Sequence, residues 1–84
     1  MVFMKKYCVY ILRSELYSEH YYTGFTENLE ERLKYHNNGQ VPHTAKYRPW
    51  IMKTAMIFSD RNQAVQFEKY LKSPSGRAFS KKRL

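Results

Sequence analysis

Three segments rich in β-branched and aromatic residues restrict this chain to a fold built around a small sheet. Residues 7–12 and 21–26 have the composition of strands, and residues 50–58 form a third such segment that is largely apolar on both faces. We expect the first two to pair as an antiparallel hairpin. If its centre lies near Leu16, Tyr10 is placed across from Tyr22, but the sequence alone does not fix the register. The third strand is predicted to be covered on both sides.

The segment between the second and third strands carries a signal for the start of a helix. Asn28 is followed three residues later by Glu31, which is a variant of the capping box, so we expect a helix over residues 29–36. The next stretch, residues 40–49, contains two prolines and no sustained period. It is predicted to be a loop with one helical turn near residues 44–46.

A second helix is predicted after the third strand. Asp60 caps a helix over residues 61–72, and the Ser-Pro-Ser-Gly run of residues 73–76 ends it. Residues 77–84 add at most a short helical turn. The predicted order is ββαβα, which corresponds to one small α+β domain of residues 1–84 with a three-stranded antiparallel sheet flanked by helices.

Positive charge is the most pronounced feature of the composition. The 84 residues carry 15 Lys and Arg against 7 Asp and Glu, which gives a formal net charge of +8. Such a balance favours a polyanionic partner such as nucleic acid or an anionic membrane surface, although it can also serve solubility alone. The chain has no acidic residue after Glu68, and the six basic residues there are predicted to bind nucleic acid: Lys69, Lys72, Arg77, Lys81, Lys82 and Arg83.

Two further features narrow the class of protein. The longest unbroken apolar run is Tyr7 to Leu12, whereas a membrane-spanning helix needs about 20 apolar residues. Cys8 is the only cysteine, so an intramolecular disulfide is not available to stabilise the core. We therefore expect a cytoplasmic protein without a membrane span, stabilised by packing.

Polar side chains interrupt the apolar stripes of both predicted helices. His36 lies on the stripe of the first helix with Arg32 at its edge, and Glu68 lies within the stripe of the second. Because a buried charge is costly unless it is paired or bound to a ligand, two explanations are open. Either Arg32 and Glu68 form a structural ion pair, or Glu68 binds a divalent metal and Arg32 a phosphate in a shared cleft.

The cleft explanation gives the strand tyrosines a chemical role. A phosphodiesterase needs a metal, a group that stabilises negative charge and a base that takes a proton from water. Tyr10 and Tyr22 are candidates for the base, since a phenol beside a cation ionises more easily than its free pKa suggests. Ordinary packing is the alternative for each of the two tyrosines.

Five motifs follow one another along the chain in a characteristic order and spacing. They are Cys8-Val9-Tyr10, then Tyr22-Thr23-Gly24 after eleven intervening residues, the run from Asn28 to Leu33 that contains Arg32, His36-Asn37, and a late Glu68. Over nearly the whole chain this set resembles the GIY-YIG endonuclease superfamily, and it looks most like small stand-alone members related to the excision-repair incision domain. The resemblance implies a three-stranded antiparallel sheet flanked by helices. It also implies a metal-dependent endonuclease that hydrolyses DNA phosphodiester bonds in repair or processing.

The resemblance implies roles for individual residues as well. Tyr10 and Tyr22 would orient or deprotonate the attacking water, and Arg32 would be the catalytic arginine. Gly24 would leave space for close backbone approach. His36 would lie beside the scissile phosphate, with a packed core histidine as the equal alternative.

The metal and the substrate also follow from the resemblance. Glu68 would be the sole protein ligand of one Mg²⁺ or Mn²⁺, and the partner would be branched, flapped or single-stranded DNA. Two features depart from the family: Cys8 and Val9 replace Gly and Ile in the first tripeptide, and no Asn follows Asn62, where many members carry a late Asn. A non-catalytic nucleic-acid-binding module with the same fold, or a basic accessory protein of a ribonucleoprotein, is therefore the alternative.

Overall fold

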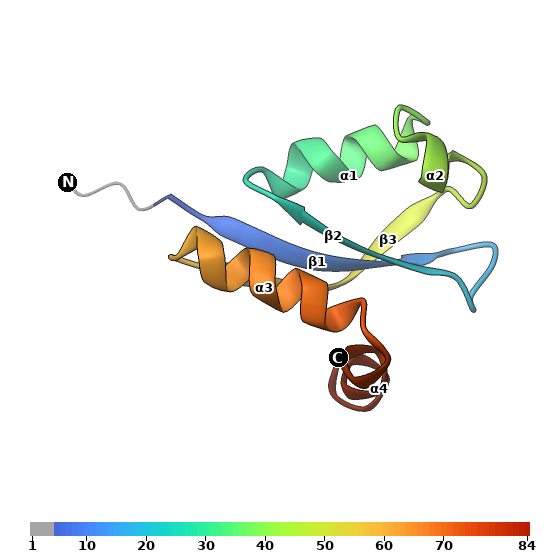
Figure 1. Cartoon of the computed structure of the whole chain (residues 1–84). Coiled ribbons are helices and arrows are strands. Elements are labelled where there is room, and N and C mark those ends of the chain that lie inside the picture. The colour runs from blue at the N-terminus through green and yellow to red at the C-terminus, as the bar shows by residue number, and fades with distance from the viewer. Residues whose placement is uncertain (1–4) are drawn as a thin grey trace.

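The computed structural model describes residues 5–84, and these residues form three strands and four helices in the order ββααβαα. The elements are β1 (Tyr7–Ser14), β2 (Tyr21–Thr26), α1 (Leu29–Asn37), α2 (Pro42–Ala45), β3 (Trp50–Phe58), α3 (Arg61–Leu71) and α4 (Pro74–Arg83). The sheet is antiparallel with the order β2-β1-β3, so β1 is its central strand. Helices α1 and α2 cover one face, and α3 and α4 lie on the other (Figure 1). The predicted α+β class and three-stranded sheet are confirmed.

The helices α1 and α3 begin where their capping residues predict. The side chain of Asn28 accepts a hydrogen bond from the backbone N–H of Glu31 at 3.1 Å, and Asp60 accepts one from the N–H of Gln63 at the same distance. Each cap satisfies a donor that the first turn of a helix leaves without a partner. The helix ends differ from the predicted ends by one residue, at Asn37 and Leu71.

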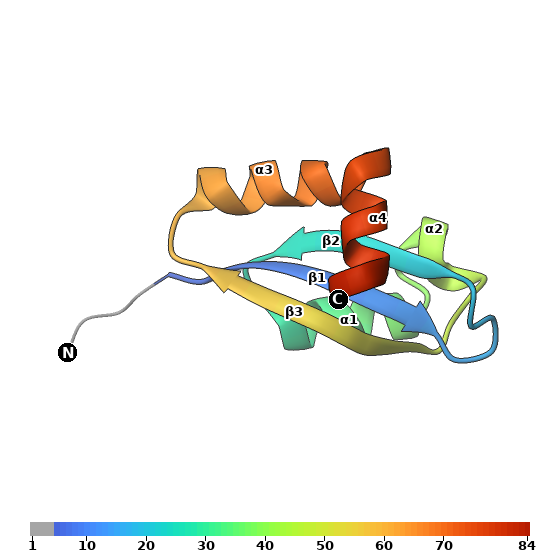
Figure 2. The ribbon, with the colours of Figure 1, turned by 90° about the horizontal axis from the view of Figure 1, so that it is seen from below.

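The C-terminal segment contradicts the prediction of at most a short turn, because residues 74–83 form the helix α4. Ser73 belongs to the run that was predicted only to end the preceding helix, yet its hydroxyl also accepts a hydrogen bond from the N–H of Gly76 at 3.1 Å. Pro74 occupies the first helical position, where its missing N–H has no cost. The same four residues therefore end α3 and begin α4, which runs across the direction of α3 (Figure 2). Helix α2 likewise begins earlier than the predicted turn, at Pro42.

The hairpin register differs from the predicted one by two residues. Tyr10 pairs with Gly24, and Tyr22 pairs with Leu12. The backbone N–H of Ser14 bonds the carbonyl of His20 at 3.0 Å, so the hairpin is centred on residue 17, one position later than predicted. A shift by two residues keeps each side chain on its face, and both tyrosines therefore still pack on the side of α1.

The prediction that β3 is covered on both sides is wrong. With the strand order β2-β1-β3 this strand lies at an edge, and every second side chain along it is exposed. Ile57 is 59% exposed despite its apolar side chain. An apolar composition therefore did not decide burial here, because only alternate side chains of β3 pack into the two cores.

An irregularity in the pairing of β1 with β3 divides the apolar side chains of β3 between the two faces. Ile11 pairs with Thr54 and Leu12 with Met52, which leaves Lys53 as an extra residue. Beyond this bulge the alternation changes side. Trp50 and Met52 pack against the cluster of Tyr10 and Leu12 under α1, whereas Met56 and Phe58 pack against the cluster of Val9, Ile11, Ala64 and Leu71 under α3.

The central strand contributes to both of these cores. Val9 and Ile11 point toward α3, and Tyr10 and Leu12 point toward α1, in the alternation that a strand between two layers requires. Within residues 5–84, no helix has the length and apolar character needed to cross a bilayer.

The packing of α4 on α3 generates a prediction about Gly76. A Cβ atom at this buried position would overlap the backbone carbonyl of Tyr70 and lie against the backbone of Leu71. We expect Gly76→Ala to lower the free energy of unfolding by about 1–3 kcal/mol, since backbone atoms cannot move aside as a flexible side chain would. Urea unfolding measures the change.

Ser75→Ala is the matched control, because Ser75 is the exposed neighbour in the same turn of α4. It should unfold close to the wild-type midpoint. Equal midpoints for Gly76→Ala and wild type would show that the contact between the two helices is not close.

Candidate active site

The candidate residues gather around the hydroxyl group of Tyr10, whose side chain is 1% exposed in the central strand. Its neighbours across the sheet are two small residues, Gly24 on β2 and Ala55 on β3. A Cβ atom on Gly24 would overlap the ring and hydroxyl of Tyr10. The close approach expected at Gly24 is therefore made by the Tyr10 ring, which lies over this glycine.

A chain of hydrogen bonds runs from Arg32 through Tyr10 into the core. The hydroxyl of Thr44 donates to the carbonyl of Val41 at 3.2 Å, so it accepts the proton of His36 Nδ1 at 2.8 Å. This arrangement assigns the tautomer of His36, and its Nε2 accepts from the Tyr10 hydroxyl at 2.8 Å. The Tyr10 oxygen in turn accepts from Arg32 Nε at 3.4 Å. Each group in this series of hydrogen bonds therefore donates to the next one, from Arg32 inward to the Val41 carbonyl.

His36 is fully buried, at 0% exposure, between α1 and α2. Of the two roles open for this residue, the structure shows the packed core histidine, and no surface of the ring is available beside a phosphate. Burial, together with the positive charge of Arg32, lowers the pKa of His36 to about 4. The ring is therefore neutral at physiological pH and holds the Tyr10 hydroxyl in place.

The expectation that a nearby cation eases ionisation of the phenol is wrong for Tyr10. Burial raises its pKa to about 12 and outweighs the opposing effect of the hydrogen bond from Arg32. Tyr10 is therefore protonated, as its donation to His36 requires. Tyr22 is half-buried, and its ring centroid lies 4.8 Å from that of His36 and 6.3 Å from that of Tyr10.

Arg32 is half-buried on α1 beside both tyrosines. Its hydrogen bond to Tyr10 is the main cause that raises its pKa, and Tyr22 contributes in the same direction. The guanidinium is therefore charged. Because the contact with Tyr10 engages only Nε, the two terminal nitrogens keep donors in a planar fork that suits phosphate oxygens.

Glu68 lies on α3, and its side chain is 19% exposed. It pairs with Lys72, one helical turn later, at 3.1 Å. In the part of the chain that the structure describes, Glu68 and Arg32 form no ion pair with each other, so the explanation of both as a structural pair is not supported. The negative charge of Glu68 is the smallest of the causes that raise the pKa of Tyr10, after burial and the neighbouring Tyr22.

The donor set at Glu68 fits a divalent ion of the magnesium type. Mg²⁺ is usually held by one or two carboxylates together with substrate phosphates and several waters, rather than by a cage of protein ligands. Glu68 offers a partly exposed carboxylate, and its partner Lys72 has a half-exposed side chain that can move aside. Among residues 5–84 no three His, Cys, Asp or Glu side chains gather, so Glu68 would act with oxygens of the substrate.

The structure separates the predicted basic patch into two groups. Lys72, Arg77 and Lys81 line a cavity next to Tyr22. The remaining three do not line this cavity: Lys69, Lys82 and Arg83. Asn62 lies at the start of α3, beside a shallow depression with Phe58 and Phe67, and so is not part of the tyrosine cluster.

Thr44 is the member of the site that the sequence did not indicate. It is 1% exposed and lies in the four-residue helix α2, where no periodic pattern marks a buried position. Its carbonyl also accepts from the indole N–H of Trp50 at 2.8 Å. The one available signal was Pro42, which begins a helical turn and so hints that Thr44 faces the core.

The site thus brings two strand tyrosines together with an arginine from α1, and α3 supplies a largely buried glutamate. The chain matches the family described as the GIY-YIG catalytic domain over residues 6–83. It therefore belongs to the GIY-YIG family of nuclease domains.

Individual relatives agree with this assignment. The structure-specific endonuclease subunit SLX1 of Debaryomyces hansenii is 40% identical over 75 residues, a match that covers 81% of this chain but only 22% of that protein. A UPF0213 protein of Bacillus cereus is 32% identical over 80% of this chain and 69% of its own length. A UPF0213 protein of Clostridium perfringens is 38% identical over 76% of this chain and 68% of its own length.

The neutral, buried state of His36 generates a prediction about pH. Its pKa is about 4 in the folded protein and 6.5 for the free side chain. Between these values the unfolded chain binds a proton that the folded chain does not, so stability is lost as the pH falls through this window. We expect the wild type to lose about 2 kcal/mol more between pH 7.5 and pH 5 than His36→Gln, as measured by urea unfolding.

His43→Gln is the matched control, since His43 is exposed on α2. It should show the same pH dependence as the wild type. If His36→Gln loses as much stability as the wild type over this range, His36 is not held neutral by burial.

Proposed function

We propose that this protein is a divalent-metal-dependent endonuclease that hydrolyses DNA phosphodiester bonds and leaves 5′-phosphate and 3′-hydroxyl ends. The observation that carries the proposal is the hydrogen bond from Arg32 to the buried Tyr10 hydroxyl beside Tyr22, together with the largely buried carboxylate that Glu68 supplies from α3. Membership of the GIY-YIG family and the net charge of +8 support it.

Arg32 is the residue that binds and stabilises the phosphate in this proposal. Its Nε is held by the buried Tyr10 hydroxyl, which fixes the orientation of the planar fork. The terminal nitrogens can then donate to two non-bridging oxygens, where negative charge develops in the transition state. Pre-orientation by a buried partner avoids a reorganisation cost at the moment of reaction.

The two tyrosines have different roles. Tyr10 has a pKa of about 12 and donates its proton to His36, so it positions Arg32 instead of acting as a base. Tyr22 lies beside Arg32 but is partly open to solvent. It is the phenol that can orient an attacking water or accept a proton from it.

A Mg²⁺ or Mn²⁺ ion bound by Glu68 would polarise the phosphate and offset its charge. Lys72 keeps the Glu68 carboxylate paired in the absence of an ion, through a contact of 3.1 Å on the surface of α3. An i,i+4 pair on a helix whose lysine is half exposed is worth only about 0.3–0.5 kcal/mol. An incoming ion therefore displaces Lys72 at little cost.

The proposed substrates are branched, flapped or single-stranded DNA, in repair or processing. One relative, SLX1, is named as a structure-specific endonuclease subunit, and this chain spans about a fifth of it. The net charge of +8 on these 84 residues favours recognition through the phosphate backbone and the shape of the DNA.

The role of Glu68 gives the first functional prediction. Purified protein should nick plasmid DNA and a labelled flap only with Mg²⁺ or Mn²⁺, and Glu68→Gln should reduce the single-turnover rate by more than about 100-fold, because the ion stabilises the transition state by several kcal/mol. Thermal unfolding of Glu68→Gln should stay close to that of the wild type, since the glutamine keeps the shape of the side chain and an i,i+4 pair with the half-exposed Lys72 contributes little to stability.

Glu15→Gln makes the same change in charge at an exposed position of the β1–β2 connection and should cleave normally. Cleavage that survives excess chelator would contradict the metal dependence. Tight binding without cleavage under any metal condition would instead favour the non-catalytic nucleic-acid-binding module.

The second functional prediction concerns the planar fork of Arg32. A lysine cannot hold the Tyr10 hydroxyl and bind two phosphate oxygens at once, so Arg32→Lys should lose about 10²–10³-fold in single-turnover cleavage. Equilibrium binding to DNA should change little, because other basic residues hold the backbone. Loss of binding and cleavage in equal proportion would make Arg32 a docking residue.

A further inference from the structure

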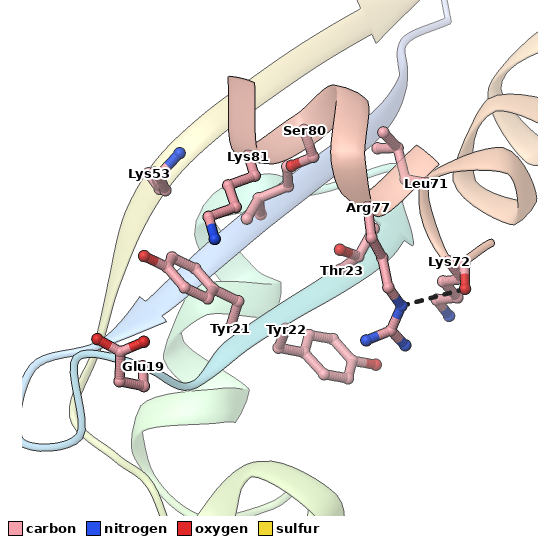
Figure 3. A pocket seen from close by; sticks show the side chains of 11 residues that line it. Glu19, Tyr21, Tyr22, Thr23, Lys53, Leu71, Lys72, Arg77, Ser80 and Lys81 are labelled. Atoms are coloured by element: carbon pink, nitrogen blue, oxygen red, sulfur yellow. Dashed lines mark hydrogen bonds between the residues drawn. The ribbon is translucent and has the colours of Figure 1, made fainter. Parts of the chain in front are cut away.

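A basic cavity of about 510 Å³ lies beside the tyrosine cluster, on the sheet face that carries α4 (Figure 3). Volumes of about 300–1,000 Å³ are typical of sites for small ligands. Its lining is unusual for so small a protein, since four basic side chains face one acidic one, Glu19. The basic residues come from β3, the end of α3 and α4: Lys53, Lys72, Arg77 and Lys81.

An exposed aromatic ring lies among these charges. Tyr21, on the edge strand β2, is 54% exposed. The ammonium of Lys53 lies 5.9 Å from the centroid of this ring, and Figure 3 shows the side chain of Lys81 extending from α4 toward it. A ring flanked by cations is the arrangement by which proteins stack a nucleobase and bind its phosphates.

The cavity is continuous with the candidate active site. Tyr22 belongs to the lining of the cavity and also packs against Tyr10 and His36. Lys72 lines the cavity as well and pairs with Glu68. Arg77 Nε donates to the carbonyl of Lys72 at 3.3 Å, which holds Arg77 at the boundary between the two regions. A strand whose phosphate lies at Glu68 would therefore pass next to this cavity.

We propose that this cavity is a nucleotide subsite that takes one unpaired base adjacent to the scissile phosphate, with the Tyr21 ring stacked on the base. Lys53, Arg77 and Lys81 contact the neighbouring phosphates. This inference rests on the proposed function and restricts its substrate class. A base within a duplex is stacked on both faces and cannot present its ring to Tyr21, so the substrate strand is unpaired next to the cleavage site.

The test is equilibrium binding in excess chelator, so that its result does not depend on cleavage. The probes are a fluorescein-labelled 12-nucleotide oligo(dT) and a duplex of the same length, measured by anisotropy with wild type, Tyr21→Ala and Tyr21→Phe. Tyr17→Ala is the matched control, because Tyr17 is an exposed tyrosine of the β1–β2 connection that does not line the cavity.

We expect Tyr21→Ala to bind oligo(dT) about 10-fold more weakly, within the range measured for loss of one stacked base. Tyr21→Phe keeps the ring and should stay within about 2-fold of the wild type. Duplex affinity and the binding of Tyr17→Ala should not change. Lys53→Ala and Lys81→Ala should each reduce the slope of log affinity against log salt by about 0.7 on the single strand.

The subsite is overturned if the wild type does not bind oligo(dT), or if Tyr21→Ala weakens duplex and single strand equally or weakens neither. Displacement of oligo(dT) by an equal charge concentration of poly-glutamate would also overturn it, because the cavity would then bind any polyanion. The two proposals fail separately. A protein that binds through Tyr21 but cleaves no DNA with Mg²⁺ refutes only the endonuclease, and one that cleaves normally without the Tyr21 ring refutes only the subsite.

Discussion

The hydroxyl of Tyr10 is the polar group around which the site is organised. It is buried at the centre of the sheet, where an unpaired hydroxyl would cost about 1–3 kcal/mol. It donates to His36, which is in turn held by Thr44, and it accepts from Arg32. This pairing joins β1 to α1 and α2, and in residues 5–84 no buried side-chain nitrogen or oxygen lacks a partner. The orientation of Arg32 therefore follows from its hydrogen bond to the buried Tyr10 hydroxyl.

The two faces of the sheet carry different groups of functional side chains, and the edge strand β2 contributes to both groups. The face under α1 holds the hydrogen-bonded chain through Tyr10, while the face under α3 and α4 carries Glu68 and the basic cavity. Tyr22 lies on β2, where it contacts both groups of residues. Because α4 supplies Arg77 and Lys81, the close packing of Gly76 against α3 determines where these charges lie. The proposed active site and the proposed nucleotide subsite therefore meet at Tyr22 on this edge.

Much of this fold could be predicted from local signals. The caps Asn28 and Asp60 predicted the starts of two helices, and β-branched and aromatic runs predicted three strands. Helix α4 was missed because Ser73-Pro74 both stops one helix and starts the next, and a single sequence does not say which effect follows. The bulge at Lys53 was missed because it leaves no trace in the sequence pattern. Apolar residues still recur at every second position of β3, but beyond the extra residue these positions face the opposite side of the sheet.

By itself the sequence determined the kinds of residue available for chemistry: tyrosines on two strands, Arg32 and His36 one helical turn apart, and Glu68 on a later helix. Spacing along each element is local, and helical and strand periods translate it directly into faces. Only the tertiary structure decided that His36 is buried and neutral, that Tyr10 is protonated, and that Lys53 lies by Tyr21. Burial, pKa and the proximity of distant residues depend on what packs against each group, and that is set by contacts between segments far apart in the chain.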